Sequence, residues 1–195
     1  MDHNIVLSGW NCRLRPVKIS DSEFIVKVRN QDFAKGFIHA TDMSIERQNE
    51  WTMQYLRRPN DYYWIVENIS ENRAVGTYGL YDIIGDLGMP GRMVLVPDSG
   101  IVLAALPILV REFAFEALNL KRLVGNVVPT NTNVIRLSKM MGGKRLEIPP
   151  PEYAYMEKEM KFDWYGITAD MWPDNKAYWI RLLGERLSGQ KGDAR

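Results

Sequence analysis

The stretch that decides the fold runs from Gly91 to Glu147 and reads GRMVLVPDSGIVLAALPILVREFAFEALNLKRLVGNVVPTNTNVIRLSKMMGGKRLE. It predicts an apolar strand over Arg92 to Val96, a turn over Pro97 to Gly100 and a long amphipathic helix. A second strand and a helix capped by Asn131 follow. Because proline has no N–H to donate to a strand ladder, the chain leaves the sheet at Pro97. This order of elements is typical of an α/β core.

The turn before the long helix suits an anionic group. Asp98, Ser99 and Gly100 are turn formers that leave backbone N–H groups free where the helix begins. Free N–H groups at the positive end of a helix dipole attract phosphate. Apolar residues at helical spacing then predict one face packed on a sheet: Leu103, Leu106, Val110, Phe113 and Ala117. The segment fits either a phosphate-binding turn or an ordinary strand–turn–helix unit.

Composition favours one enzyme-sized domain over residues 1–195. The chain is 195 residues long and 46% hydrophobic, so it can bury a sizeable core, and its polar tail over 189–195 is expected to fray. A net charge of +1 gives no electrostatic case for nucleic acid or membrane. The single Cys12 excludes an internal disulfide. Without a signal-peptide pattern or a membrane-spanning apolar run, a cytoplasmic protein is expected.

Two helices and a hairpin are predicted before the decisive stretch. Ser20 and Glu23 form the capping box of a first helix, and Ser44 caps a second helix that carries Trp51 and Tyr55 at helical spacing. Aromatic and β-branched runs predict a hairpin over 62–67 and 74–83. Loops are expected over 85–91 and 149–151, and further strands over 121–128, 144–147 and 153–168.

The pattern resembles the Gcn5-related N-acetyltransferase superfamily, closest to its ribosomal-protein-alanine and aminosugar-nucleotide branches. LRPVKISDSEFIVKVRN, from Leu14 to Asn30, resembles the first strand and helix of that superfamily, and the run from Ser44 to Ile83 resembles its second helix and hairpin. FDWYGIT followed by Trp172 is similar to its late strand and last helix. The resemblance implies a mixed, mostly antiparallel sheet of about seven strands flanked by helices, with a splay between the fourth and fifth strands.

The resemblance also implies that acetyl-coenzyme A is the acetyl donor, that an amine accepts the acetyl group and that no metal is needed. The fourth and fifth strands of the family correspond to 92–96 and 122–128 here, and an N–H around Met93 to Leu95 would polarise the thioester carbonyl. Asn131 would bond the pantetheine arm, or it is a plain helix cap. The expected cofactor-binding residues are Met93, Val94, Leu95, Val96, Pro97, Asp98, Ser99, Gly100, Ile101, Val102, Leu103 and Asn131.

Two departures from the family pattern bear on mechanism. The glycine-rich pyrophosphate loop of the family is reduced here to the single Gly100. The family pattern Asn-x-x-x-Ile-x-Leu-Tyr appears as Asn131, Ile135, Leu137 and Ser138, so the tyrosine that protonates the leaving thiolate in many relatives is a serine. Ser138 either donates to the thiolate, directly or through water, or is a small packing residue.

The candidates for a general base are His39 and Asp86. His39 lies between the first two helices, where the family forms its acceptor pocket, and its unperturbed pKa is near neutrality. Asp86 is the carboxylate nearest to the start of the fourth strand. The alternatives are a solvated loop histidine and a turn aspartate among glycines.

Four residues are predicted to bind the acceptor. Arg29 and Asn30 resemble an Arg-Asn pair in branches that acetylate amino sugars on nucleotide carriers, and an arginine fork suits a diphosphate. The alternative is an arginine that only complements the helix dipole. Tyr78 and Tyr81 either stack on a sugar or base or belong to the core.

These observations predict an acetyltransferase whose amine acceptor attacks directly in a ternary complex, since no cysteine lies near the turn to carry an acetyl group. A small molecule, above all an aminosugar nucleotide, is the favoured acceptor. The alternatives are N-terminal acetylation of a protein or peptide, which predicts an open groove with acidic residues, and a catalytically silent fold that binds coenzyme A or a partner. A homodimer paired through an exposed edge at Tyr153 to Thr168 is a further expectation.

Overall fold

An eight-stranded sheet forms the centre of the computed structural model, which describes residues 3–32, 34, 44–158 and 161–190. The strands are β1 (Leu7–Gly9), β2 (Cys12–Pro16), β3 (Tyr62–Asn68), β4 (Arg73–Ile84), β5 (Leu87–Leu95), β6 (Arg122–Val127), β7 (Lys144–Leu146) and β8 (Asp163–Thr168). Their order is β1-β2-β3-β4-β5-β6-β8-β7, and every neighbouring pair is antiparallel except β5 and β6. The predicted mixed, mostly antiparallel fold is confirmed.

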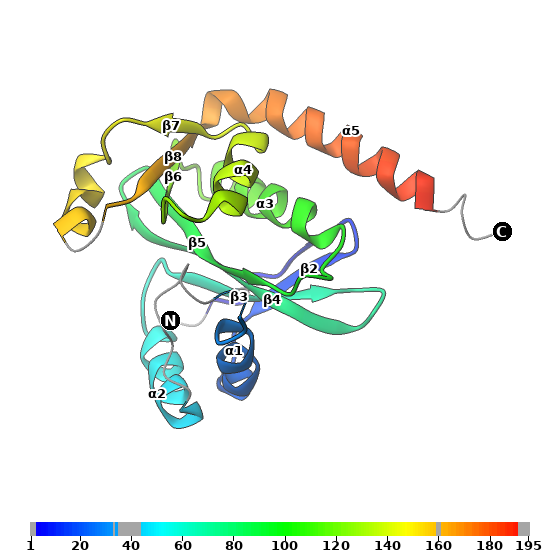
Figure 1. Cartoon of the computed structure of the whole chain (residues 1–195), viewed down its shortest axis with the longest axis vertical. Coiled ribbons are helices and arrows are strands. Elements are labelled where there is room, and N and C mark those ends of the chain that lie inside the picture. Colours follow the sequence, from blue (N-terminus) through cyan, green and yellow to red (C-terminus); the bar gives the residue numbers. More distant parts are fainter. Residues whose placement is uncertain (1–2, 33, 35–43, 159–160, 191–195) are drawn as a thin grey trace.

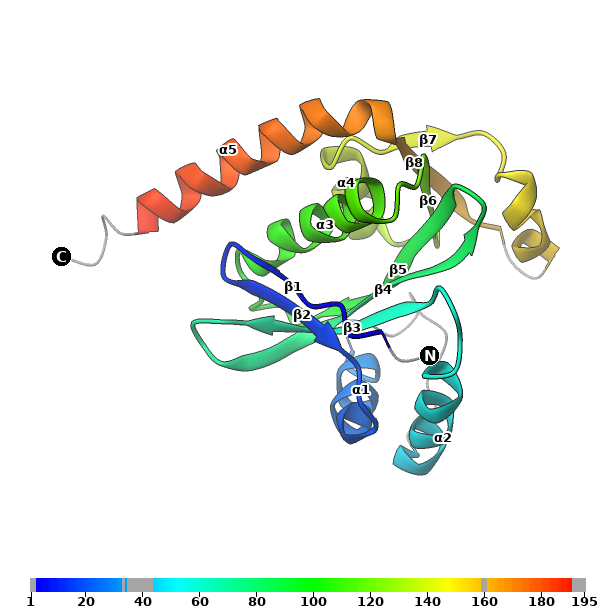
Figure 2. The same cartoon turned by 180° about the vertical axis from the view of Figure 1, so that it is seen from behind.

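Helices cover both faces of the sheet. Figure 1 shows α1 and α2 below the sheet and α3, α4 and α5 above it, and Figure 2 shows the same layers from behind. The helices are α1 (Ser22–Arg29), α2 (Ile45–Tyr55), α3 (Val102–Glu112), α4 (Thr132–Met140) and α5 (Trp172–Gln190). Short 3-10 segments span Ile19–Asp21, Pro151–Lys158 and Ala169–Met171, and a π-helical turn over Phe113–Ala117 continues α3. Among the described residues, no helix is long and apolar enough to cross a bilayer.

The strand β3 carries apolar side chains on both of its faces. Trp64 and Val66 belong to the main core cluster, which includes residues of α3 and α5, whereas Tyr63 and Ile65 join a second cluster with α1 and α2. Successive strand residues point to opposite faces, so a strand covered by helices on both sides is apolar throughout. This explains why the run over 62–67 lacks an alternation of apolar and polar residues.

The sheet has eight strands, so the expected count of about seven is wrong. The additional strand is β1, which pairs with β2 through a tight turn at Trp10 and Asn11. Both turn residues have positive φ, 48° and 63°, as two-residue hairpin turns of the favoured hand require. The predicted fourth and fifth strands are therefore β5 and β6 of the structure.

Two predicted loop and strand boundaries are also wrong. Most of 85–91 belongs to β5, and only Gly85 and Asp86 form the turn before it. Residues Pro151–Lys158 form a 3-10 helix, because three successive prolines end strand pairing there, and the late strand begins only at Asp163. That strand, β8, lies between β6 and β7, so it is not the free edge on which the expected dimer was based.

The helix predictions were confirmed in part. Ser44 caps α2, because its Oγ accepts a hydrogen bond from the Arg47 N–H at 3.2 Å. The capping box at Ser20 is wrong: a 3-10 turn precedes α1, and the Asp21 carboxylate accepts from the Lys18 N–H at 2.8 Å instead. Leu103 and Ala117 are exposed, although a buried position was predicted for both. The buried face of α3 begins at Val102 and continues from Ala105 to Val110, and the π-helical turn shifts the helical spacing before Ala117.

Gly76 on β4 lies against the backbone of β5. A Cβ at this position would stand 2.1 Å from the Val94 carbonyl oxygen and 2.9 Å from the Leu95 Cα. Because backbone cannot move aside without disturbing the β4–β5 ladder, Gly76→Ala is expected to lower the free energy of unfolding by about 3 kcal/mol in urea denaturation. The control is Gly184→Ala in α5, where a Cβ meets nothing within 4 Å. This variant should raise the free energy of unfolding by up to about 1 kcal/mol, because alanine has the higher helix propensity. Equal stabilities of the two variants would contradict this packing.

Candidate active site

The strands β5 and β6 separate soon after they begin. Their parallel pairing is limited to Leu87 with Arg122 and Gly88 with Leu123, and beyond these residues the strands diverge. The predicted splay is confirmed at this place. A cavity of about 800 Å³ opens there, lined by residues of α1, α3, α4, β4, β5, β6, β8 and the 3-10 segment after Pro150.

A β-bulge interrupts β5 at the mouth of the splay. Thr77 of β4 pairs with Val94 and Gly79 pairs with Gly91, so two steps along β4 span three steps along β5. Arg92 has a φ of 52°, and its carbonyl accepts a hydrogen bond from Thr77 Oγ1 at 2.9 Å. A bulge leaves its extra residue outside the ladder. Because β6 no longer pairs with β5 at this level, the edge of β5 beside Met93 that faces β6 has no partner strand in the described part of the chain.

The side chain of Arg92 is fixed on the α1–α2 side of the sheet. Both guanidinium NH2 groups donate to the Asp61 carboxylate, Nη2 to Oδ2 at 2.9 Å, and these side chains are only 16% and 9% exposed. The guanidinium carbon lies 4.1 Å from the ring centre of Tyr81, 5.4 Å from that of Tyr63 and 5.6 Å from that of Trp51. Such contacts attract a cation to the ring faces. The bulge is thus held by an ion pair and three aromatic rings.

The turn at the start of α3 has the conformation that an anion site needs. Gly100 has a φ of 58°, and a Cβ there would meet nothing within 4 Å, so the position is open. Ser99 is buried; its N–H donates to the Val96 carbonyl and its carbonyl accepts from the Val102 N–H. Among the described residues, no protein acceptor takes the amide hydrogens of Gly100 or Ile101. These free amides at a helix N-terminus fit a phosphate group.

The structure brings six of the expected site residues to the cavity: Arg29, Tyr78, Tyr81, Met93, Asn131 and Ser138. Burial raises the pKa of Tyr78 to about 12, so its hydroxyl keeps its proton at neutral pH. Asn131 acts as the N-cap of α4, because its Oδ1 accepts from the Val134 N–H at 3.2 Å. Its predicted role toward a cofactor stays a prediction beside that structural one.

Other expected residues lie away from the cavity lining. Asn30 donates from Nδ2 to the Val26 carbonyl at the end of α1. Asp86 lies in the β4–β5 turn, where its half-exposed carboxylate meets Arg122 at 3.2 Å. His39 falls outside the described residues. Ten expected residues form the end of β5, the following turn and the start of α3 rather than the cavity wall: Val94, Leu95, Val96, Pro97, Asp98, Ser99, Gly100, Ile101, Val102 and Leu103.

Sequence reasoning missed two arginines that line the cavity, Arg92 on β5 and Arg111 on α3. With Arg29 they make three cations, whereas the described residues that line this cavity include no carboxylate and no histidine. A signal for Arg111 was available, because Arg111 and Glu112 are the first charged residues after the apolar run of the helix over 101–110. The cationic side chains at the cavity wall therefore have no lining carboxylate beside them among the described residues, although Arg92 is paired with Asp61 behind the wall. Among the described residues, no cluster of three metal-ligating side chains occurs.

A mostly antiparallel sheet splayed beside a bulge, with a turn of free amides leading into a helix, is the arrangement of the GNAT acetyltransferase fold. The model of the Acetyltransferase (GNAT) domain matches residues 11–144, more than half of the chain. The protein therefore belongs to the GNAT family of N-acetyltransferases and is an acetyltransferase.

Three relatives illustrate this membership. The probable N-acetyltransferase YjcK of Bacillus subtilis (strain 168) is 27% identical over 150 residues, which cover 70% of this chain and 82% of YjcK. Apo FdhC, described as a nucleotide-linked sugar GNAT, superposes with a TM-score of 0.78 at 24% identity over 93% of this chain and 99% of FdhC. Mycobacterium smegmatis RimJ, solved with CoA-disulfide, gives a TM-score of 0.71 at 15% identity over 92% of each chain. The two structures share the fold.

Proposed function

We propose that this enzyme transfers an acetyl group from acetyl-coenzyme A to an amine carried by a small anionic molecule, with an aminosugar nucleotide as the favoured acceptor. The observation that carries the proposal is the cation Arg29 at the cavity wall, beside the Asp61-paired Arg92, with no carboxylate among the described lining residues. Arginine binds phosphate oxygens through its planar fork. The description of FdhC as a nucleotide-linked sugar GNAT supports the same acceptor class.

The donor would enter from the α3–α4 side. The free amides around Gly100 suit its pyrophosphate, Asn131 stands at the start of α4, and the backbone of β5 beside Met93, where β6 no longer pairs, would supply an N–H to the splay. An N–H aimed at the thioester carbonyl stabilises the charge that develops on its oxygen. The only cysteine of the chain, Cys12, is buried in the main core cluster and does not line the cavity. The amine therefore attacks the thioester directly.

The acceptor would enter from the opposite side, below the sheet in Figure 1, where α1 ends at Arg29. Arg29 supplies a cation there, and Tyr81 lines the same cavity with its ring against the Asp61-paired Arg92. A Cβ at Gly91 would come within 2.6 Å of the Tyr81 hydroxyl oxygen. The Tyr81 ring therefore fits in its present position only because residue 91 has no side chain. Aromatic and cationic groups together favour a sugar nucleotide over a neutral amine.

Acetylation of a peptide N-terminus is the second candidate, and RimJ shares the fold. That activity needs acidic groups that read a free α-amine, and the described lining residues include none. A catalytically silent protein that only binds coenzyme A is the third candidate. Acetyl transfer to any amine separates this third candidate from the first two, and the acceptor separates the first from the second.

The test is an acceptor panel read as initial rates of coenzyme A release. Aminosugar nucleotides should be acetylated, whereas the same aminosugars without the nucleotide diphosphate and peptides with free N-termini should react far more slowly. A charge-assisted hydrogen bond contributes about 1.5–3 kcal/mol, so Arg29→Gln should raise KM for the acceptor about 10- to 100-fold. The exposed Arg145, paired with Asp163 on the sheet edge, provides the control Arg145→Gln. Faster acetylation of peptides, or an unchanged KM in Arg29→Gln, would contradict the proposal.

A further inference from the structure

Arg111 is a cation on the donor side of the cavity. It lies near the end of α3 and lines the cavity together with Pro107 and Val110 of the same helix. Across from it stands α4, which contributes Leu137 and Ser138 to the wall. The charge therefore faces the space between α3 and α4, on the opposite face of the sheet from Arg92.

Arg111 differs from the neighbouring arginines in its partners. Its Nη1 donates to the Met141 carbonyl at the end of α4, and no carboxylate of the described chain forms an ion pair with it. Arg92 is paired with Asp61, and Arg122 with Glu152. Burial lowers the pKa of the Arg111 guanidinium, but an arginine remains charged. Its remaining donors suit an anion in the cavity.

The directions from which acceptor and donor enter the cavity indicate which anion Arg111 would meet. An amine that enters past Arg29 reaches the bulge from the α1–α2 side, so the leaving group of the donor departs toward α3 and α4. The polar side chains that line that side include Tyr78, Asn131, Ser138 and Arg111. The Asn131 oxygen already caps α4, and the Ser138 hydroxyl is neutral. Arg111 alone among them brings a positive charge.

We infer that Arg111 binds and stabilises the coenzyme A thiolate as it leaves, an inference that rests on the proposed acetyl transfer. The amine nitrogen bonds to the acetyl carbon, the C–S bond breaks, and its electron pair stays on sulfur. The proton of the amine passes to water, and the thiolate is released paired with the guanidinium or takes a proton from solvent. A charge in this place lets the thiolate leave without a tyrosine at position 138.

A purely structural role for Arg111 makes a different prediction. If the guanidinium only ties α3 to the Met141 carbonyl, its loss changes stability but not the acidity of a bound thiol. If it faces the sulfur, its charge favours the thiolate, because thiols beside a cation have a pKa of about 3.5–7.5 in place of about 8.5. The acidity of bound coenzyme A therefore distinguishes the two roles.

The experiment titrates coenzyme A bound to the full-length enzyme and follows thiolate absorbance in the ultraviolet. The thiol pKa in the wild-type complex is expected at least about one unit below that of free coenzyme A. Arg111→Met should return it to the free value, Arg111→Lys should keep most of the shift because the charge remains, and the exposed control Arg145→Met should keep all of it. In Arg111→Met, kcat with acetyl-coenzyme A should fall about 10- to 100-fold, in line with the loss of one oriented charge.

Each other outcome overturns the inference. An unshifted thiol pKa in the wild-type complex, or a shift that persists in Arg111→Met, would leave Arg111 with a structural role only. If Arg111→Met does not fold, a shift lost in a folded Arg111→Lys that still binds coenzyme A would also overturn it. Failure of the wild type to bind coenzyme A at all would be a separate result, because it refutes the proposed function and the inference with it.

Discussion

Arg92→Met is expected to lower the free energy of unfolding by about 3 kcal/mol, because it leaves the Asp61 carboxylate, only 9% exposed, with no cation among the described residues closer than the exposed Arg58 at 3.9 Å. The same change removes the contacts with Tyr81, Tyr63 and Trp51 that hold the bulge of β5. Urea denaturation measures the loss of stability. Acetyl transfer by the folded fraction should fall as well, since the bulge would no longer keep its backbone toward the splay.

Two further variants make this expectation specific. Asp61→Asn combined with Arg92→Met removes both charges, so the double variant should recover part of the stability lost in Arg92→Met. Arg145→Met breaks an ion pair with Asp163 in which the arginine is 66% exposed, and such exposed pairs contribute about 1 kcal/mol or less. A loss in Arg92→Met as small as in Arg145→Met would show that the Arg92–Asp61 pair does not stabilise the bulge.

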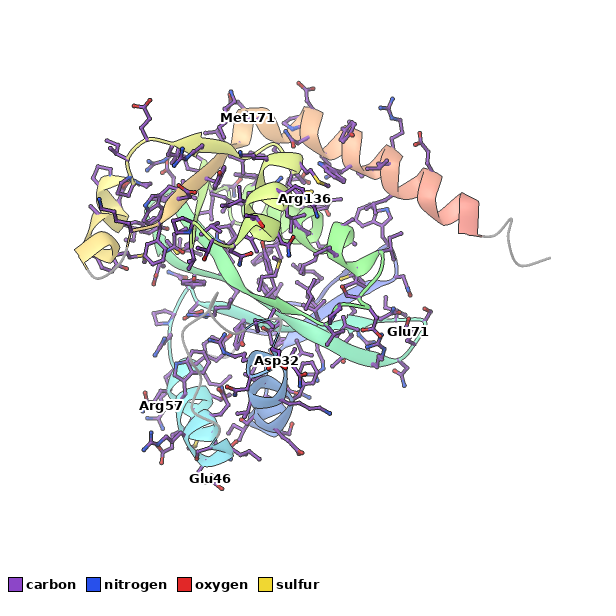
Figure 3. The ribbon with its side chains drawn as sticks, in the orientation of Figure 1. Asp32, Glu46, Arg57, Glu71, Arg136 and Met171 are labelled. Atoms are coloured by element: carbon purple, nitrogen blue, oxygen red, sulfur yellow. The ribbon has the colours of Figure 1, made fainter. Side chains whose placement is uncertain are left out.

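Local sequence signals predicted the parts of this fold that depend on neighbours in the chain. The Ser44 cap, the hairpin of β3 and β4 and the exit from the sheet at Pro97 each rest on a few adjacent residues, and the structure has all three. Trp51 and Tyr55 stack at 5.6 Å as their helical spacing predicts. Figure 3 shows Arg57 and Glu46 at α2 and Arg136 on α4, on opposite sides of the sheet. The resemblance to the family had predicted a sheet flanked by helices.

The bulge and the charge of the cavity could not be predicted from local patterns. The bulge depends on the register of β5 against β4, and its arginine is paired with Asp61, thirty-one residues earlier in the chain. Arg29, Arg92 and Arg111 come from three elements that only the folded sheet brings to one cavity. The π-helical turn after α3 also escaped prediction, because the mostly apolar segment over 113–117 suits an ordinary helix equally well.

Gly100→Glu is expected to weaken binding of acetyl-coenzyme A at least about 100-fold, because it places a negative charge where the pyrophosphate should sit. Nothing lies within 4 Å of the Cβ position, so the side chain fits without a clash, and the φ of 58° adds a strain of about 1–2 kcal/mol. The variant should therefore fold with a modest loss of stability. Its defect should lie in the binding of the donor.

Gly85→Glu is the matched control for this variant. Gly85 has a φ of 60° and also has nothing within 4 Å of its Cβ position, but it lies in the β4–β5 turn, away from the start of α3. The two variants therefore share the backbone strain and the added charge. Only the position relative to the turn from Pro97 to Gly100 differs, so a difference in binding reports on that turn.

The most direct measurement is a calorimetric titration of acetyl-coenzyme A into the wild type, Gly100→Glu and Gly85→Glu. The wild type and Gly85→Glu should bind with similar affinity, whereas Gly100→Glu should show no measurable binding at the same concentrations. That result would place the donor at the α3 N-terminus and the splay of β5 and β6. Absence of binding to the wild type, or equal binding to Gly100→Glu, would contradict this account of the site.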